Sequence, residues 1–222
     1  MSSVLIIGAS RGIGLEFVRQ YRADDATVTG TARNEEGLGR IRALGARALP
    51  LDVATAVGSS GPAWPIDGER FDTVVLNAGV FGSRSQGLQT PSQEEFDLVM
   101  HTNVLAAMRL LPQLESALAP AARVAVLSSK MGSIALRAAN SGWLYRASKA
   151  ALNSVLKDAS LAWAGKAICV AFHPGWVRTD MGGSSADLDV QTSVGDMRRT
   201  LAGLQAKDNG SFFNHDGTLL AW

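Results

Sequence analysis

The sequence predicts an α/β domain built on a parallel β-sheet. Short runs of branched apolar residues alternate with stretches of helical pattern, which is typical of consecutive βαβ units. The first run, residues 4–7, is apolar at every position, as in a strand that is buried on both faces. Small and polar residues recur where the predicted strands end, and that is the edge where ligands bind in open parallel sheets.

The composition limits the classes of function. The chain has 222 residues, of which 46% are hydrophobic and 18% charged, enough for one sizeable core. A formal net charge of +1 without a long basic run argues against nucleic acid or an anionic membrane as the partner. Cys169 is the only cysteine, which excludes an intrachain disulfide or a cysteine-based metal site. No apolar run approaches the roughly 20 residues of a membrane helix. The strand-like start leaves no room for a signal peptide, so we expect a cytoplasmic protein.

The alternation predicts six strands and four helices. The strands are expected over residues 4–7, 26–31, 47–51, 71–76, 123–127 and 167–172. The helices are expected over residues 15–21, 35–44, 91–119 and 142–164. Ser92 is the predicted N-cap of the third helix, and Pro112 is expected to bend or divide it.

Three stretches are less regular. Residues 53–70 hold several glycines and prolines, so we expect a short irregular connection in place of a helix. Residues 180–207 are expected to form loop and weak helix. Residues 212–222 are a candidate for one last strand.

A glycine-rich turn, GASRGIG at residues 8–14, follows the first strand. Glycine tolerates positive φ and lets a bulky ligand approach the backbone. The free N–H groups and the dipole at the start of the next helix favour a phosphate or pyrophosphate. The glycine spacing alone is equally consistent with a plain strand-to-helix turn, so the interpretation depends on the residues downstream.

The end of the second predicted strand bears on the choice between NAD and NADP. NAD sites of this type usually place a carboxylate there, which accepts the ribose 2′-hydroxyl. Here Arg33 occupies that region, and Arg11 lies in the glycine turn. A guanidinium is suited to a 2′-phosphate, so we favour NADP(H) over NAD(H). The alternative is that both arginines are solvated surface residues.

Tyr145 and Lys149 are the candidate catalytic pair. They are four residues apart at the start of a predicted helix, so they share one face. A lysine ammonium beside a phenol lowers the phenol pKa from its usual value near 10, which makes it a usable general acid or base. Ser129, at the end of the preceding strand, is placed to hydrogen-bond a substrate oxygen. Taken alone, the pair is more typical of a packed tyrosine beside a solvated lysine than of a catalytic pair.

Together the motifs resemble those of the short-chain dehydrogenase/reductase family over nearly the whole chain. The matching pieces are GASRGIG at 8–14, Asp52-Val53, NAG at 77–79, Asn103, Ser128-Ser129, YRASK at 145–149 and PGWVRTD at 174–180. The stretches PGWVRTDMGG and FFNHDGTLLAW are most similar to its small carbonyl-reductase and C-signal-like branch. The resemblance implies a Rossmann-type, doubly wound parallel sheet of seven strands with helices on both faces. It implies one domain over 1–222, with a cofactor part at about 1–130 and a catalytic and substrate part at about 129–222.

The resemblance also implies a role for individual residues. Tyr145 would donate the proton to a carbonyl, and Ser129 would hold the carbonyl oxygen. Lys149 would bind the nicotinamide ribose and lower the pKa of Tyr145, and Asn103 would hold a water that relays protons to Lys149. The implied cofactor contacts are Gly8, Ser10, Arg11, Gly12, Ile13, Gly14, Arg33, Asp52, Val53, Asn77, Ala78, Gly79, Tyr145, Lys149, Pro174, Gly175, Val177 and Thr179.

The implied activity is NADP(H)-dependent hydride transfer between nicotinamide and a small ketone, aldehyde or secondary alcohol, without a metal. The alternative is a cofactor-binding sensing or signalling protein with little turnover. The intact set of four catalytic candidates favours the enzyme. The resemblance further implies a homodimer or homotetramer packed through the helices predicted at 91–119 and 142–164.

Some assignments stay open. Sixteen residues separate Ser129 from Tyr145, more than is usual in the family, so Ser128 and Ser133 are alternatives to Ser129. The short stretch after Thr179 predicts a small substrate lid and an open pocket. Two roles are open for Trp143, Trp176 and Met181. They either line this pocket or pack in the core or at the rim. The side chains expected only to pack or to face solvent are His101, His173, His215 and Cys169.

Overall fold

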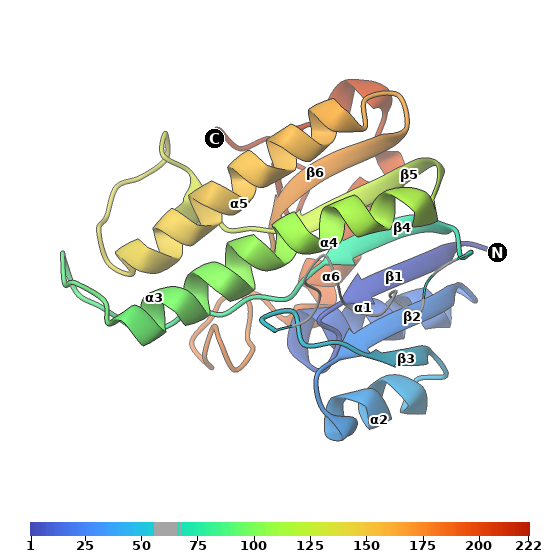
Figure 1. Ribbon diagram of the computed structural model, residues 1–222, viewed down its shortest axis with the longest axis horizontal. Helices are drawn as coiled ribbons and strands as arrows, with labels where there is room; N and C mark the ends of the chain where they lie inside the picture. Colours follow the sequence, from blue (N-terminus) through green and yellow to red (C-terminus); the bar gives the residue numbers. More distant parts are fainter. Residues whose placement is uncertain (56–65, 67) are drawn as a thin grey trace.

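Seven parallel strands form one sheet in the computed structural model, which describes residues 1–55, 66 and 68–222 (Figure 1). Their order is β3-β2-β1-β4-β5-β6-β7. The strands are β1 Ser3–Ile7, β2 Thr27–Ala32, β3 Arg47–Pro50, β4 Phe71–Leu76, β5 Leu118–Leu127, β6 Ala167–His173 and β7 Ser211–Asn214. The order reverses between β1 and β4, because the chain runs outward to β3 and then returns to the other side of β1. Ligands bind at such a switch point in doubly wound sheets.

Helices cover both faces of the sheet (Figure 1). They are α1 Gly12–Ala23, α2 Glu35–Ala43, α3 Gln93–Met100, α4 Ala106–Leu114, α5 Trp143–Ala162 and α6 Val190–Gly203. Helices α1, α2 and α6 pack on one face, and α4 and α5 pack on the other. Leu5 and Ile7 point into the core beneath α4 and α5, whereas Val4 and Ile6 point into the opposite core. Burial on both faces explains why the first strand is apolar at every position.

The long predicted helix is interrupted at His101–Leu105 and not at Pro112, so the expectation of a break at the proline is wrong. Residues His101–Leu105 form a π-helical segment between α3 and α4. Helix α4 continues through Pro112, which is exposed, as is Met108 one turn earlier. Proline has no backbone N–H, so the carbonyl of Met108 receives no helical hydrogen bond. Because both residues are exposed, this carbonyl lies on the solvent side of the helix. Ser92 caps α3 as predicted, because its hydroxyl accepts a hydrogen bond from the Glu95 backbone N–H.

The C-terminal third is more regular than the sequence predicts. The expected loop and weak helix over 180–207 contains α6, a helix of 14 residues capped by the Asp189 side chain. Val194, Met197 and Leu201 bury one face of α6 against the sheet. The candidate last strand is confirmed at Ser211–Asn214 and pairs with β6. After it the chain turns back, and the backbone N–H of Leu220 donates to the carbonyl of Phe212.

The irregular connection predicted over residues 53–70 falls mostly on residues 56–65 and 67, which lie outside the described residues. Within the part of the chain that the structure describes, no helix combines the length and apolar character needed to cross a membrane.

Candidate functional site

The predicted site residues gather at the carboxyl edge of the sheet. Strands β1, β4, β5 and β6 run in the same direction and end at Ile7, Leu76, Leu127 and His173. The segments that follow them carry the glycine turn, the NAG motif, the two serines and the Pro174-Gly175 pair. Parallel pairing therefore brings four motifs that are far apart in sequence to one edge (Figure 1).

The glycine turn packs directly against the loop that follows β4. Gly8 has φ of +84°, and a Cβ there would lie 2.8 Å from the Ala78 backbone nitrogen. A Cβ on Gly14 would lie 2.2 Å from the carbonyl oxygen of Gly8. The Asn77 side-chain amide donates to that same oxygen over 2.6 Å. Only glycine fits these two positions, so packing alone requires Gly8 and Gly14, and their contact with a cofactor stays a prediction.

The start of α1 is suited to an anion. The helix begins at Gly12 with Arg11 as N-cap, and no side chain of the described chain caps it. Its first-turn N–H groups are therefore available to phosphate oxygens, and the helix dipole favours negative charge there. Thr179 lies beside the same turn, because its Cγ2 would be 3.4 Å from a Cβ on Gly12. These residues fit the pyrophosphate of a dinucleotide.

Three arginines lie near the ends of β1 and β2. Arg11 pairs with Asp180 over 2.7 Å, and both side chains are largely exposed. Arg33 is exposed and makes no ion pair with the described chain. Arg40, which sequence reasoning missed, donates to the Ser10 carbonyl over 3.2 Å and pairs with Glu36. The sequence signal that could have indicated Arg40 is its position on the helix that follows Arg33. Arg33 is thus the arginine of this corner that is exposed and without an ion pair in the described chain.

Asp52 and Val53 lie at the end of β3 and in the turn that follows. The Asp52 carboxylate accepts a hydrogen bond from the backbone N–H of Ala54 over 3.0 Å. Val53 is half-buried and packs against the core beneath α4 and α5. The aspartate therefore shapes the turn that follows the strand, beside the predicted adenine site.

Tyr145 and Lys149 lie side by side in the first turns of α5, as predicted. Tyr145 is 7% exposed and Lys149 is 3% exposed. The Lys149 ammonium donates to the carbonyl oxygen of Leu127 over 2.8 Å and lies 5.7 Å from the centroid of the Tyr145 ring. Helix α5 thus holds both groups against the end of β5.

The three candidate serines have different partners. The Ser128 hydroxyl donates to the Asn153 side chain over 2.5 Å. The Ser133 hydroxyl is fully buried and donates to the carbonyl of Ala221 over 2.7 Å. Ser129 accepts from the Met131 backbone N–H over 3.1 Å, and its side chain interacts with Tyr145. Of the three, Ser129 is therefore the serine placed to act with Tyr145.

Burial dominates the electrostatics of the pair. It raises the pKa of Tyr145 to about 12, and the side-chain interaction with Ser129 lowers that pKa by less. Burial also lowers the pKa of Lys149 to about 8. The prediction that Lys149 brings the tyrosine pKa toward neutral is therefore wrong for the ligand-free chain. The physical reason is that removal from water disfavours the phenolate and the ammonium alike.

Asn103 lies in the π-helical segment and ties the loop after β4 to α5. Its side-chain oxygen accepts from the Val80 N–H, and its amide donates to the Val80 carbonyl, both over 2.8 Å. The same amide donates to the Ser148 hydroxyl over 2.9 Å. A Cβ on Gly79 would lie 3.3 Å from both Asn103 and the Lys149 amine. Asn103 thus positions Gly79 beside Lys149, and its relay water stays a prediction.

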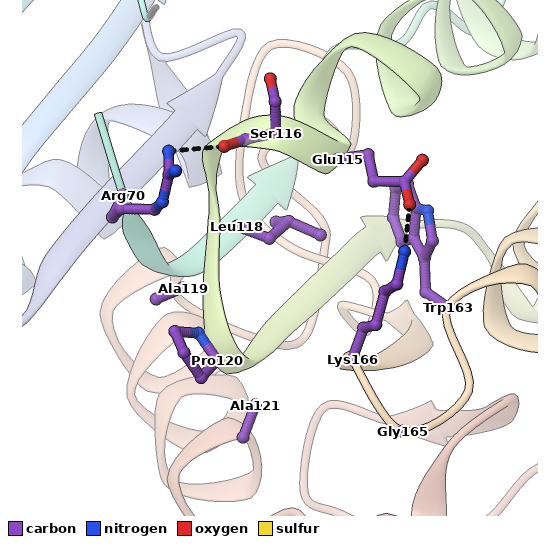
Figure 2. Close-up of a pocket in the computed structure, with 10 residues that line it drawn as sticks. All are labelled: Arg70, Glu115, Ser116, Leu118, Ala119, Pro120, Ala121, Trp163, Gly165 and Lys166. Atoms are coloured by element: carbon purple, nitrogen blue, oxygen red, sulfur yellow. Dashed lines mark hydrogen bonds and ion pairs between the residues drawn. The ribbon is translucent and has the colours of Figure 1, made fainter. Parts of the chain in front are cut away.

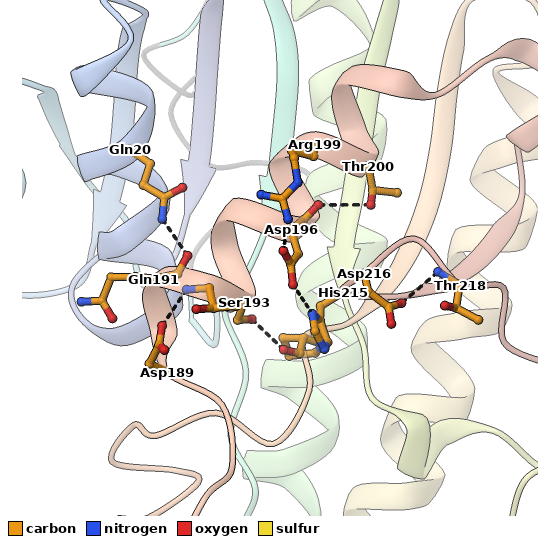
Figure 3. A network of polar contacts seen from close by, with 12 residues as sticks. Gln20, Asp189, Gln191, Ser193, Asp196, Arg199, Thr200, His215, Asp216 and Thr218 are labelled. Carbon is orange, nitrogen blue, oxygen red and sulfur yellow. Dashed lines mark hydrogen bonds and ion pairs between the residues drawn. The ribbon is translucent and has the colours of Figure 1, made fainter.

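The loop after β6 is supported by a network that sequence reasoning missed (Figure 3). Gly175 has φ of +87°, and a Cβ there would lie 3.2 Å from the imidazole of His215. That imidazole pairs through Nδ1 with the Asp196 carboxylate over 2.8 Å. The Ser193 hydroxyl donates to the carbonyl of Pro174 over 2.6 Å. No pattern in the sequence indicated this network, because α6 itself was not expected to be a regular helix.

The other predicted contact in this loop, Val177, is buried and forms a parallel bridge with Leu188. His173, just before Pro174, is mostly buried, and burial together with His215 and Lys130 lowers its pKa to about 4. His101 is exposed on the π-helical segment. Cys169 is fully buried in β6, as expected for a small apolar residue, and burial raises its pKa to about 12.

Comparison with known proteins agrees with this geometry. The family model described as short chain dehydrogenase matches residues 2–188. The chain belongs to the short-chain dehydrogenase family. Among curated relatives, this short-chain dehydrogenase is 35% identical to C-signal of Myxococcus xanthus over 154 residues, which cover 68% of this chain and 92% of C-signal. It is 26% identical, over the full length of both chains, to 1-hydroxy-2-glutathionyl-2-methyl-3-butene dehydrogenase of Rhodococcus.

Solved structures of related proteins have the same fold. A short-chain dehydrogenase/reductase of Burkholderia multivorans with bound NADP superposes with a TM-score of 0.89 at 29% identity, covering 100% of this chain and 99% of that one. The carbonyl reductase Sniffer of D. melanogaster superposes with a TM-score of 0.85 at 32% identity, covering 100% of both chains. The similarity thus extends over the carboxyl edge of the sheet and the glycine turn.

The side chains that the sequence predicted for the substrate pocket of this short-chain dehydrogenase are all exposed. Trp143 is 37% exposed, and its indole N–H donates to the carbonyl of Gln89. Trp176 is 52% exposed, and its indole N–H donates to the carbonyl of Gly182. Met181 is also exposed. The three side chains are therefore not core residues, and their contact with a substrate stays a prediction.

A separate pocket of about 510 Å³ lies at the opposite, amino-terminal edge of the sheet (Figure 2). It lies beside the start of β5, where Arg70 donates to the carbonyl of Ser116 and Lys166 pairs with Glu115. None of the predicted catalytic or cofactor residues lines it. The predicted site of this short-chain dehydrogenase and this pocket therefore lie at opposite edges of the sheet.

Proposed function

We propose that this chain is an NADP(H)-dependent oxidoreductase that interconverts small ketones or aldehydes and secondary or primary alcohols. The observation that carries the proposal is the buried Tyr145, flanked by Ser129 and Lys149, at the same edge as the glycine turn. A binding module needs the turn but has no use for a buried proton donor beside a serine and a lysine.

Tyr145 is the general acid in the reduction direction. With a pKa near 12 in the ligand-free chain, it holds its proton at neutral pH and donates it to a carbonyl oxygen. The Ser129 hydroxyl donates a hydrogen bond to the same oxygen and stabilises the charge that develops on it. When bound, NADPH supplies a hydride to the carbonyl carbon.

Lys149 supports this proton transfer. Its amine lies against the Tyr145 ring and is held by the Leu127 carbonyl. In its ammonium form Lys149 would favour the phenolate that is left after proton donation. Gly8, Gly12 and Gly14 would hold the pyrophosphate, and the Pro174-Gly175 loop with Val177 and Thr179 would hold the nicotinamide end.

Two observations support NADP(H) over NAD(H). Arg33 is exposed at the end of β2 without an ion pair in the described chain, so its guanidinium is open to a 2′-phosphate. The Burkholderia multivorans structure, which has the same fold, contains NADP.

The carbonyl reductases among the structural neighbours support a carbonyl substrate. The relative named C-signal supports the alternative of a cofactor-binding signalling protein with little turnover.

We further propose that the protein acts in the cytoplasm as a homodimer or homotetramer. Leu98 on α3, Met108 on α4 and Leu161 on α5 are each more than half exposed. Helices α3, α4 and α5 lie next to one another on one face of the molecule (Figure 1). Pairing of these helices between subunits would remove the three side chains from water.

The test is NADPH consumption across a panel of ketones, aldehydes and diones. Tyr145→Phe should lower kcat by about 10² to 10⁴, because the general acid is lost while cofactor binding remains. Tyr21→Phe is the matched control, since Tyr21 is the other tyrosine of the chain and lies away from the site on α1. Tight NADPH binding without turnover of any substrate would favour the signalling alternative. Turnover that survives in Tyr145→Phe would exclude the tyrosine as acid.

A further inference from the structure

Arg84 connects two loops at the mouth of the site. It lies in the loop after β4, and its Nη2 donates to the carbonyl oxygen of Met181 over 3.0 Å. Met181 is in the short segment between β6 and α6, 97 residues along the chain. The Arg84 side chain is exposed, yet this hydrogen bond fixes where its charge lies.

The Arg84 guanidinium and the proposed proton donor Tyr145 contact the same aromatic ring. The guanidinium carbon lies 5.5 Å from the centroid of the Phe81 ring. The Phe81 ring stacks on Tyr145, with centroids 4.5 Å apart and planes inclined by 24°. A cation over an aromatic face is attracted to it, so Phe81 holds the guanidinium close to the tyrosine.

The Arg84 charge has no carboxylate partner in the described part of the chain. The carboxylates of its neighbourhood are engaged elsewhere. Glu95 accepts from the Ser83 backbone N–H over 2.7 Å, and Asp180 pairs with Arg11. The Met181 carbonyl uses one of the five N–H donors of the guanidinium. The remaining donors form a fork that matches a carboxylate in geometry and charge.

We propose that Arg84 binds a carboxylate of the substrate, so that the enzyme acts on oxo acids. This inference rests on the proposed reductase function. Arg84 and Tyr145 each contact the Phe81 ring, from 5.5 Å and 4.5 Å, so a carboxylate on Arg84 and a carbonyl on Tyr145 would be several bonds apart. The arrangement therefore selects oxo acids with a remote carboxylate over α-oxo acids, and the apolar ring of Phe81 packs against the methylene chain between the two groups.

The experiment compares linear oxo acids with one to four methylene groups between ketone and carboxylate, each beside its methyl ester, at saturating NADPH. In the wild type we expect kcat/KM of the longer acids to exceed that of their esters by about tenfold to a hundredfold, the range of one charge-assisted hydrogen bond. Arg84→Gln keeps an amide that can donate to the Met181 carbonyl but removes the charge. It should bring the acids down to the level of the esters, mainly through KM, and leave the esters unchanged.

Arg70→Gln is the matched control, because Arg70 also donates to a backbone carbonyl but lies at the opposite edge of the sheet (Figure 2). It should leave the preference for acids intact. An equal loss for acids and esters in Arg84→Gln would show that Arg84 only holds the two loops together, and it would overturn the inference. A wild type that does not distinguish acids from esters would also overturn it. A wild type that turns over no carbonyl compound would overturn the proposed function itself, and the inference with it.

Discussion

The Lys149 ammonium donates to the carbonyl oxygen of Leu127, over 2.8 Å, at the end of β5. The amine is therefore anchored to the sheet, while the face of the Tyr145 ring lies 5.7 Å away. Both groups are almost fully buried, and burial of the charged form of either group costs free energy because the charge is removed from water. This cost leads to a test of stability against pH.

Lys149→Met should stabilise the ligand-free chain at neutral pH. The folded pKa of Lys149, about 8, lies below the ordinary 10.5. Below pH 8 the folded and unfolded chains both carry the proton, so the full burial penalty is present. As the pH rises from 8 to 10.5 the folded chain loses the proton first, and the penalty disappears. We expect the variant to gain about 2 kcal/mol at pH 7, after loss of the hydrogen bond to Leu127.

This gain should shrink steadily toward pH 10.5, as measured by urea unfolding at a series of pH values. Lys157→Met is the matched control, because Lys157 is exposed on the same helix and also donates to a backbone carbonyl. Because Lys157 is exposed, no burial penalty is removed with it, and Lys157→Met should not gain stability at pH 7. A gain in Lys149→Met that grows with pH would contradict the assignment of a burial penalty.

Arg33→Ala should weaken NADPH binding by about tenfold to a hundredfold and change NADH binding little. The reason is that NADPH alone carries the 2′-phosphate, and one charge-assisted hydrogen bond is lost. Arg11→Ala should cost less, because Arg11 must first give up its ion pair with Asp180. Isothermal titration with both cofactors checks this. Arg42→Ala is the control on α2, and equal losses for NADPH and NADH in Arg33→Ala would rule out the 2′-phosphate contact.

Ser129→Ala and Ser133→Ala should separate activity from stability. Ser129→Ala removes the hydroxyl beside Tyr145 and should lower kcat by about 10² to 10³ with little change in Tm. Ser133→Ala should keep turnover within a few-fold but lower the free energy of unfolding by about 1 to 3 kcal/mol. The buried Ser133 hydroxyl joins the loop after β5 to the Ala221 carbonyl and also accepts from the Leu136 N–H. The reverse pattern would mean that Ser133 is the catalytic serine.

The sequence predicted six strands, four helical stretches and the edge at which the motifs meet, because hydrophobic periodicity and the positions of glycine and proline are local signals. It did not predict α6 as a regular helix. The apolar pattern of that stretch is interrupted by Gly195, Asp196 and the arginines at 198 and 199. The stretch is helical because Val194, Met197 and Leu201 bury against the sheet. It also missed the π-helical segment at His101–Leu105, where the Asn103 side chain is tied to the backbone of Val80.

By itself the sequence determined the family and the parallel α/β architecture, and it indicated Tyr145 and Lys149 as the candidate pair, because these depend on residue types at fixed spacing. Only the tertiary structure decided which serine interacts with the tyrosine, which arginine near the glycine turn has no ion pair in the described chain, and that Arg84 lies over Phe81. It also reversed the expected direction of the tyrosine pKa. The physical reason is that burial and charge pairing join residues far apart in the chain: Arg11 and Asp180, which are 169 positions apart, form one ion pair.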